Sequence, residues 1–358
     1  MARNLLHLSL TPLLGLSLLG CPGDDTGKDD TGDSGTDTDT GDSGTDTSET
    51  GDTGETGDTG DTADTADTAD TADTADTGDT AATPMFEVLV DDADIAEVTD
   101  VAVAGVDGVY VVGIDSAGDG GIWWVEADGS GVLAVATDFS LTQPTGIALS
   151  EDGNTLYVSD LAPASPTGAM NGAVYSLPSG GGTLTEVGTA DQIDLPGDVV
   201  VIPGGGGLYV SGFDADGEPT IFIVNSGVTV GVAGGSLTDP TALAVSPDGT
   251  WLFVLDSLAA DWGASILAFE LPDYNESELA SGFDVAFPGG VGTDGASVWY
   301  SKLGDPGLLE AAADGSGFSV VDTTGLMELP AGVAVGADQV YVTESAHDVG
   351  ADLYLYSF

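Results

Sequence analysis

Basic residues are almost absent from this chain of 358 residues. It holds 3 lysines and arginines against 61 aspartates and glutamates, which gives a formal net charge of −58. Of the acids, 41 lie in residues 85–358, where Lys302 is the only base. Because a surface this negative repels phosphate backbones, we expect no binding to nucleic acid. It suits cations, cationic ligands or a salty environment that screens the repulsion among the acids.

Cysteine and histidine are scarce as well. Cys21 is the only cysteine, so no disulfide can form within the chain and packing alone must hold the fold together. His7 lies in an N-terminal apolar segment, and His347 is the only other histidine. Zinc, haem and iron–sulfur sites need several cysteine or histidine ligands and are therefore excluded. We expect His347 to lie in a solvent-facing loop.

The chain also lacks an apolar run long enough to span a membrane. Leu5 to Leu19 amounts to about fifteen residues, whereas a permanent span takes roughly 20. A short basic start, Met1-Ala2-Arg3-Asn4, precedes this run. Residues 1–20 are therefore interpreted as a secretory signal peptide.

The end of this segment, Leu18-Leu19-Gly20-Cys21, resembles the bacterial lipobox. The resemblance implies cleavage before Cys21 and lipidation of that residue, which would attach the protein to a membrane, since two or more acyl chains anchor stably. An ordinary signal peptide followed by an incidental cysteine is the alternative. Pro22 is not an inner-membrane retention residue in the sorting pattern of such lipoproteins. We therefore expect an exported protein that is anchored to the outer membrane and exposed at the cell surface.

Residues 21–84 form a segment of low complexity. No Val, Ile, Leu, Phe, Tyr or Trp occurs between Pro22 and Pro84. Such a segment cannot bury enough apolar surface to offset its ordering entropy, so a disordered, lipidated tether is predicted. Its aspartates could bind Ca²⁺ weakly, and its Asp-Thr-Ala triplets could carry O-glycans. A plain solvated spacer is the simplest interpretation.

From residue 95 onward the sequence repeats itself. One copy is Q-P-T-G-I-A-L-S-E-D-G-N-T-L-Y-V-S-D, from Gln143 to Asp160, and another is D-P-T-A-L-A-V-S-P-D-G-T-W-L-F-V-L-D, from Asp239 to Asp256. Six copies are aligned by the residue that precedes the first apolar strand of each: Asp100, Gly146, Asp198, Ala242, Gly290 and Gly332. Their spacing of 42 to 52 residues, with several short strands in each copy, is typical of a β-propeller.

The last copy ends too early to be complete. Each copy predicts four strands, but Asp352 to Phe358 is only the third strand of the sixth copy. Phe86 to Val90 precedes the first copy as an outermost strand precedes every later one. It should complete the last blade and remove an exposed sheet edge. The prediction is an all-β, six-bladed β-propeller over residues 85–358, and we expect a monomer.

The consensus P-x-G-[IV]-A-[LV]-x-x-D-G-x-x-L-Y-V-x-D is similar to the repeats of the NHL-type and gluconolactonase-like (SMP-30) propellers. The similarity covers residues 86–358. It implies the fold, which hosts both hydrolases and plain binding scaffolds. Two features depart from NHL proteins: Asp160 and Asp256 are not followed by the usual Asn-His-Arg-Ile-like turn, and the basic surface of the RNA-binding members is missing.

Carboxylates end the second strand of alternate copies. Asp160, Asp256 and Glu344 occupy this position, near one mouth of the predicted channel. Oxygen ligands of this kind suit Ca²⁺, the one cofactor that the sequence suggests. The resemblance implies a channel Ca²⁺ held by Glu, Asn and Asp that activates a lactone or ester, although no Asn ends these strands. The three acids could instead cap turns or bond to neighbouring blades, or hold a structural cation.

Two functions follow from the sequence. The first is a non-enzymatic lipoprotein whose acidic propeller binds a protein, glycan, small molecule or cation. The alternative is a Ca²⁺-dependent hydrolase of lactones or esters. No catalytic residue is predicted.

Overall fold

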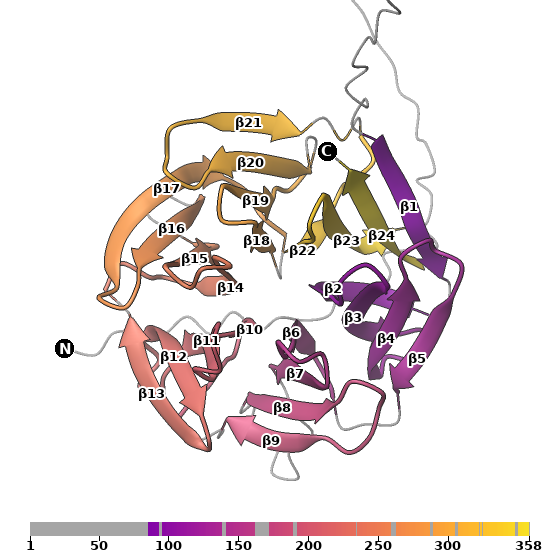
Figure 1. The fold of residues 1–358 in the computed structure, drawn as a ribbon, viewed down its shortest axis with the longest axis horizontal. Coiled ribbons are helices and arrows are strands. Elements are labelled where there is room, and N and C mark those ends of the chain that lie inside the picture. Colours follow the sequence, from indigo (N-terminus) through magenta and orange to yellow (C-terminus); the bar gives the residue numbers. More distant parts are fainter. Residues whose placement is uncertain are drawn as a thin grey trace, which may run out of the picture. The chain divides into compact units, whose positions relative to one another are not determined.

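A computed structural model describes residues 85–357, except 93–94, 138–140, 162–171, 189–191, 234, 259–262, 287–288, 305–306, 322, 324 and 348–349. The described residues form 24 strands in six sheets of four, set as blades around a central axis (Figure 1). This confirms the six-bladed, all-β propeller. None of these residues forms a helix long and apolar enough to cross a membrane. The predicted signal peptide, Cys21 and the tether lie outside the described residues.

The blades follow the order of the repeats, and each runs from its innermost to its outermost strand. Blade 1 holds β2 (Ile95–Val103), β3 (Gly108–Asp115), β4 (Gly120–Glu126) and β5 (Val132–Ala136). Blade 2 holds β6 (Pro144–Leu149), β7 (Thr155–Asp160), β8 (Ala173–Pro178) and β9 (Thr185–Gly188). Blade 3 holds β10 (Val199–Val201), β11 (Leu208–Phe213), β12 (Pro219–Asn225) and β13 (Val228–Ala233).

The second half of the ring has the same plan. Blade 4 holds β14 (Pro240–Val245), β15 (Trp251–Asp256), β16 (Ala264–Glu270) and β17 (Asn275–Phe283). Blade 5 holds β18 (Val291–Thr293), β19 (Ser297–Ser301), β20 (Leu308–Ala312) and β21 (Phe318–Val321). Blade 6 holds β22 (Pro330–Val335), β23 (Gln339–His347), β24 (Gly350–Ser357) and, outermost, β1 (Met85–Asp92).

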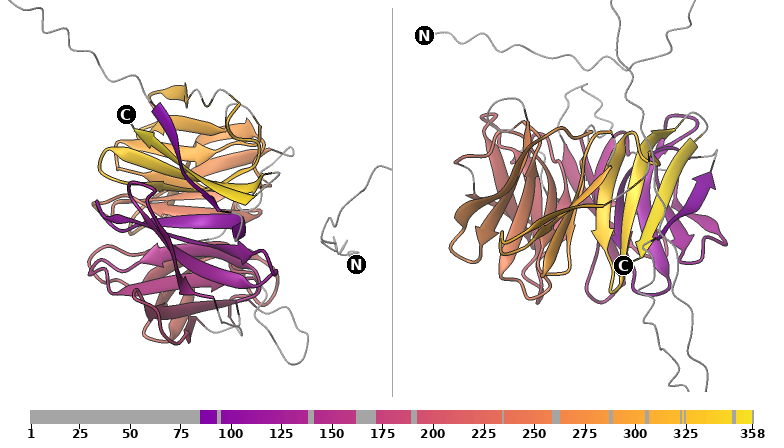
Figure 2. Two further views of the ribbon diagram at one scale, coloured as in Figure 1. Left: turned by 90° about the vertical axis from the view of Figure 1, so that its right-hand side faces the viewer. Right: turned by 90° about the horizontal axis from the view of Figure 1, so that it is seen from above.

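Strand β1 closes the ring, as the repeat pattern predicts. It pairs antiparallel with β24, from Met85 opposite Ser357 to Asp92 opposite Ala351 (Figures 1 and 2). Leu89 of β1 is buried with Leu353 of β24 in the cluster that also joins blade 1. The last blade is therefore built from both ends of the propeller sequence. As a result β24 is paired on both sides, with β23 and with β1, and presents no exposed edge.

The core lies between adjacent blades. Among the described residues, buried apolar side chains form six clusters, and each cluster combines side chains from two consecutive blades. One of them joins Val112 and Ile122 of blade 1 to Leu156 and Val158 of blade 2. Each fully buried side chain of this size contributes about 1.5–3 kcal/mol of transfer free energy. Packing between sheets thus holds the ring, as the lack of a disulfide requires.

Candidate functional site: the central channel

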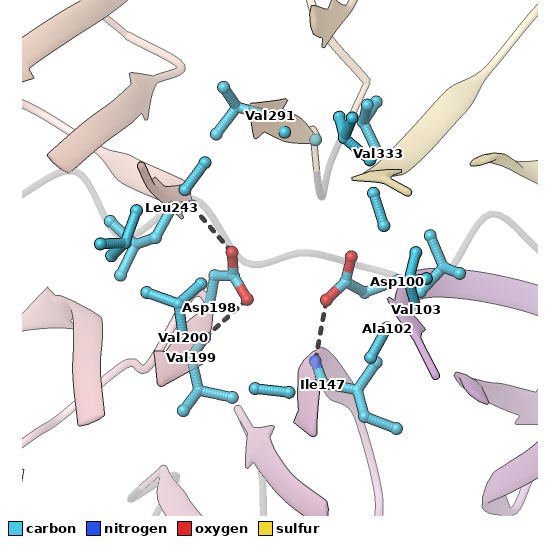
Figure 3. A pocket seen from close by; sticks show the side chains of 18 of the residues that line it. Asp100, Ala102, Val103, Ile147, Asp198, Val199, Val200, Leu243, Val291 and Val333 are labelled. Atoms are coloured by element: carbon cyan, nitrogen blue, oxygen red, sulfur yellow. Dashed lines mark hydrogen bonds between the residues drawn. The ribbon is translucent and has the colours of Figure 1, made fainter. Parts of the chain in front are cut away.

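A cavity of about 290 Å³ lies on the axis, lined by the innermost strands. Most of its lining side chains are aliphatic, from valine, alanine, leucine and isoleucine. Two carboxylates interrupt this surface, those of Asp100 and Asp198, and they point toward each other across the channel (Figure 3). Asp198 is only 7% exposed, and Asp100 is partly exposed to the channel.

Both carboxylates bond to the backbone of the next blade. Oδ2 of Asp100, in blade 1, accepts the N–H of Ile147 in blade 2 at 2.8 Å. Oδ2 of Asp198 accepts the N–H of Leu243 in blade 4, also at 2.8 Å, and its Oδ1 accepts the N–H of Val199 at 2.6 Å. Each carboxylate therefore joins one blade to the next and satisfies an amide of an innermost strand, which would otherwise be costly to bury.

Asp100 and Asp198 occupy the position that aligns the six copies, and small residues occupy it in the other four. Around the ring the six residues are Asp100, Gly146, Asp198, Ala242, Gly290 and Gly332. A Cβ atom added at Gly146 would lie 2.3 Å from Oδ1 of Asp198, and one at Gly332 would lie 2.5 Å from Oδ1 of Asp100. A glycine precedes each aspartate in the ring, and a Cβ atom added there would meet both the carboxylate and the Cα atom of that aspartate. The backbone alone also requires glycine, because a Cβ atom added at Gly290 would lie 2.3 Å from the carbonyl oxygen of Ala331 in the next blade.

Both channel carboxylates bind protons more tightly than usual. Removal from water raises the pKa of Asp100 to about 7, against the lowering effect of its bonds to the amides of Ile147 and Val101. The open side of Asp100 faces a mainly aliphatic channel, so its charged form is poorly solvated. Burial, and then the negative charge of Asp100, raise the pKa of Asp198 well above its usual range. The pair therefore favours a state that carries one proton or one cation.

The three carboxylates predicted from the sequence are not part of the channel lining, and each accepts backbone N–H groups. All three side chains are fully buried. The two oxygens of Asp160 accept the N–H groups of Thr142 and Gln143, each at 2.9 Å. Asp256 accepts those of Thr238 and Asp239 in the same way, each at 2.7 Å. Oε1 of Glu344 accepts the N–H groups of Glu328 and Leu329. We call these three residues the loop clamps, because each fixes the segment that enters its own blade.

The loop clamps do not gather around an ion. Among the residues that the structure describes, no three acidic, histidine or cysteine side chains come together as metal ligands would. The channel offers two carboxylates in an otherwise mainly aliphatic wall, whereas Ca²⁺ takes six to eight oxygen ligands. These two carboxylates therefore supply fewer oxygen ligands than the calcium site that the resemblance implied. Use of the loop clamps as metal ligands stays a prediction.

Sequence reasoning missed Asp100 and Asp198 as site residues, although it used them to align the copies. The available signal was an acid in two copies at the aligned position where the other four copies have glycine or alanine.

His347, expected in a loop, instead ends β23, where it pairs with Gly350 of β24. That expectation was wrong because the hairpin of blade 6 extends beyond the repeat consensus.

No known family profile matches the sequence, and no curated protein matches it either. Solved structures do match the fold. A gluconolactonase from Xanthomonas campestris aligns with a TM-score of 0.59 at 16% identity, over 76% of this chain and 89% of its own. The calcium-binding protein regucalcin from Agrobacterium tumefaciens aligns with a TM-score of 0.55 at 15% identity, over 75% of this chain and 92% of its own.

The fold is a six-bladed propeller similar to those of this gluconolactonase and of regucalcin. At these identities the likeness shows the architecture alone. A luciferin-regenerating enzyme has the same architecture, with a TM-score of 0.52 at 12% identity over 77% of this chain and 96% of its own. The function must therefore be argued from the side chains of this chain.

Proposed function

We propose that this protein is a binding module, held at the cell surface through Cys21, whose propeller takes a cationic partner. The observation that carries the proposal is the imbalance of charge around its clefts. Two clefts of about 570 and 680 Å³ flank the turn between β6 and β7, and Asp107, Glu151, Asp152 and Glu186 line them. Lys302 is the only base in residues 85–358, so positive charge for these acids must come from outside the chain.

The use of the buried acids supports binding rather than catalysis. The loop clamps and the channel carboxylates accept backbone N–H groups, and these bonds hold loops and blades in place. Such residues stabilise a rigid ring. A rigid ring is a suitable support for a recognition surface, because the surface loses little conformational entropy when it binds.

The sequence supports the place of attachment. The lipobox-like segment that ends at Cys21 and the acidic segment of residues 21–84 suit a lipid anchor and a spacer. A spacer of this length would present the clefts to partners beyond the membrane surface. Cys21→Ser should release the protein from the membrane fraction, and a protein that stays in that fraction would contradict the anchor.

Calorimetric titration of the unlipidated Cys21→Ser protein tests the binding function. A hexa-arginine peptide should bind with saturation at 50 mM NaCl and more weakly at 500 mM, because screening weakens contacts between exposed charges. A hexa-glutamate peptide of the same length should not bind. If hexa-arginine fails to bind at low salt, the proposal is wrong.

A Ca²⁺-dependent hydrolase is the second candidate. One observation favours it: Asp100 and Asp198 face each other in the channel and could share a cation (Figure 3). The chemistry of the gluconolactonase neighbour gives the substrate to test, gluconolactone. Stoichiometric ⁴⁵Ca²⁺ binding in equilibrium dialysis, with lactone hydrolysis that Asp100→Asn and Asp198→Asn both abolish, would favour this candidate. The absence of both activities from the unmodified protein would remove it.

A further inference from the structure

We propose that the cleft between blades 1 and 2 is a binding site for an organic cation, such as a guanidinium or an alkylammonium group. The inference rests on the proposed binding function and names its site and ligand chemistry. The cleft has a volume of about 570 Å³, within the range of small-ligand sites. Val103 and Leu149 line both this cleft and the channel, so it opens beside one channel mouth.

Two aromatic rings form the blade 1 side of the cleft. Tyr110 of β3 and Trp124 of β4 stand directly opposite each other, with ring centroids 4.8 Å apart and planes inclined by 60°. A Cβ atom added at Gly108 would lie 2.7 Å from the indole ring, so the absence of a side chain there leaves room for Trp124. Both rings are partly exposed and line the cleft. Aromatic rings attract cations through the negative charge on their faces.

Three carboxylates surround the same cleft. Asp107 comes from the turn between β2 and β3, and Glu151 and Asp152 come from the turn between β6 and β7. Oδ1 of Asp152 accepts the hydroxyl of Ser150 at 2.6 Å and the N–H of Asn154 at 3.1 Å. These bonds, that from Ser150 first, lower the pKa of Asp152 to about 2, so it stays ionised near neutral pH. Oε1 of Glu151 accepts the N–H of Gly204 in the next blade at 2.7 Å, which fixes its position.

The aromatic rings and the carboxylates of the cleft together favour one chemical class of ligand. Carboxylates repel phosphates and other anions, and the aromatic pair gains little from a fully hydrated metal ion. An organic cation satisfies both walls, because its charge pairs with the carboxylates while its apolar part contacts the rings. Val106, which is 88% exposed, lies in the turn between β2 and β3, and its neighbours Gly105 and Asp107 line the cleft. The proposed ligand is therefore positively charged and carries alkyl or planar apolar surface.

The ring contains a natural control for this site. At the junction of blades 3 and 4 the same frame carries Tyr209 opposite Ile223, where blade 1 has Tyr110 opposite Trp124. Pro247 stands in place of Glu151, and Gly206 in place of Asp107. Asp248 repeats the turn of Asp152, with its Oδ1 accepting the hydroxyl of Ser246 at 2.7 Å. Asp152→Asn and Asp248→Asn thus weaken the same turn interaction, but only the first changes the proposed site.

The test is calorimetric titration of the unlipidated protein with arginine amide, tetramethylammonium and hexa-arginine. We expect Trp124→Leu and Asp152→Asn to weaken binding about tenfold or more, which corresponds to about 1.4 kcal/mol. Asp248→Asn should bind as the unmodified protein does. Trp124→Phe keeps an aromatic face and should recover part of the affinity, which separates loss of the ring from loss of folding. Binding of the free cations identifies a small ligand, and binding of hexa-arginine alone identifies a side chain of a partner.

Two results would overturn the site. If Asp152→Asn and Asp248→Asn weaken hexa-arginine binding equally, or if Trp124→Leu folds and binds normally, cations bind elsewhere and only the site is wrong. If none of the three probes binds the unmodified protein, the binding function fails together with the site. Thermal unfolding of every variant shows which of them are folded.

Discussion

Blades 1 and 2 carry the same buried acids as blades 3 and 4. Asp100 corresponds to Asp198 in the channel, and Asp160 corresponds to Asp256 among the loop clamps. Their partners correspond as well, since each channel carboxylate accepts an amide at the same position of the following blade. The exposed side of the two junctions differs, with Trp124 and Glu151 in one and Ile223 and Pro247 in the other.

This difference shows which residues are constrained by packing around the axis of the propeller. Near the axis, innermost strands crowd together, and a carboxylate and the glycine beside it must fit each other to within tenths of an ångström. The exposed residues at the two blade junctions are not packed this closely, so they can differ without loss of the fold. The comparison indicates that the inner acids maintain structure, and it places the difference between the two junctions in the cleft of blades 1 and 2. Four measurements test this division, in order of expected effect.

The loop clamps should give the largest and most similar effects. Asp160→Ala and Asp256→Ala each remove a buried carboxylate and its two hydrogen bonds to backbone N–H groups, so each should lower the free energy of unfolding by about 3–5 kcal/mol. Urea denaturation measures both. A loss that is several times larger in one blade than in the other would show that the two junctions are not equivalent inside.

Stability should depend on pH through the channel pair. The pKa of Asp100 rises from 3.8 in an ordinary site to about 7 in the fold, so the folded state binds the proton more tightly than the unfolded chain. The resulting stability is complete below about pH 4 and is lost as pH rises through 7, with a decrease of about 2–3 kcal/mol between pH 5 and 8. Urea denaturation at both pH values should show this decrease, and the Asp100→Asn, Asp198→Asn double variant should show less of it. An equal decrease in that variant would assign it to general charge repulsion.

The small residues of the ring should respond in a position-dependent way. Gly146→Ala places a Cβ atom against Oδ1 of Asp198 and should destabilise the protein by about 1–3 kcal/mol. The combination Gly146→Ala with Asp198→Gly removes the closest contact of the added Cβ atom, that with Oδ1, and should recover part of this loss in thermal unfolding. Failure to recover any of it would refute the pairing of glycine and aspartate.

The turn acids should have the smallest effects. Asp152→Asn and Asp248→Asn weaken the same serine-to-aspartate turn at exposed positions, so their melting temperatures should fall slightly and by equal amounts. Their cation affinities should differ, as proposed for the cleft of blades 1 and 2. Unequal melting temperatures would show that the two turns are poor controls for each other.

The sequence predicts the fold well because the repeat is local. The spacing of the copies, the turn glycines Gly153 and Gly249 with positive φ angles, and the strand Phe86 to Val90 are sufficient for six blades and their closure. It also placed Asp160, Asp256 and Glu344 at matching strand ends and allowed that they cap turns. The choice between a clamp and a metal ligand needs the positions of backbone amides such as those of Thr142 and Gln143, which lie 18 and 17 residues from Asp160.

By itself, the sequence determined the propeller and its strongly acidic character, since both depend on residue types and their spacing along the chain. Only the tertiary structure decided how the acids are used. It brings Asp100 and Asp198 together across the channel, although they lie in different copies, and it places Tyr110 and Trp124 beside Glu151 and Asp152 of the next blade. These groupings depend on how far each blade turns about the axis. That rotation is set by packing between sheets, which the repeat pattern does not encode.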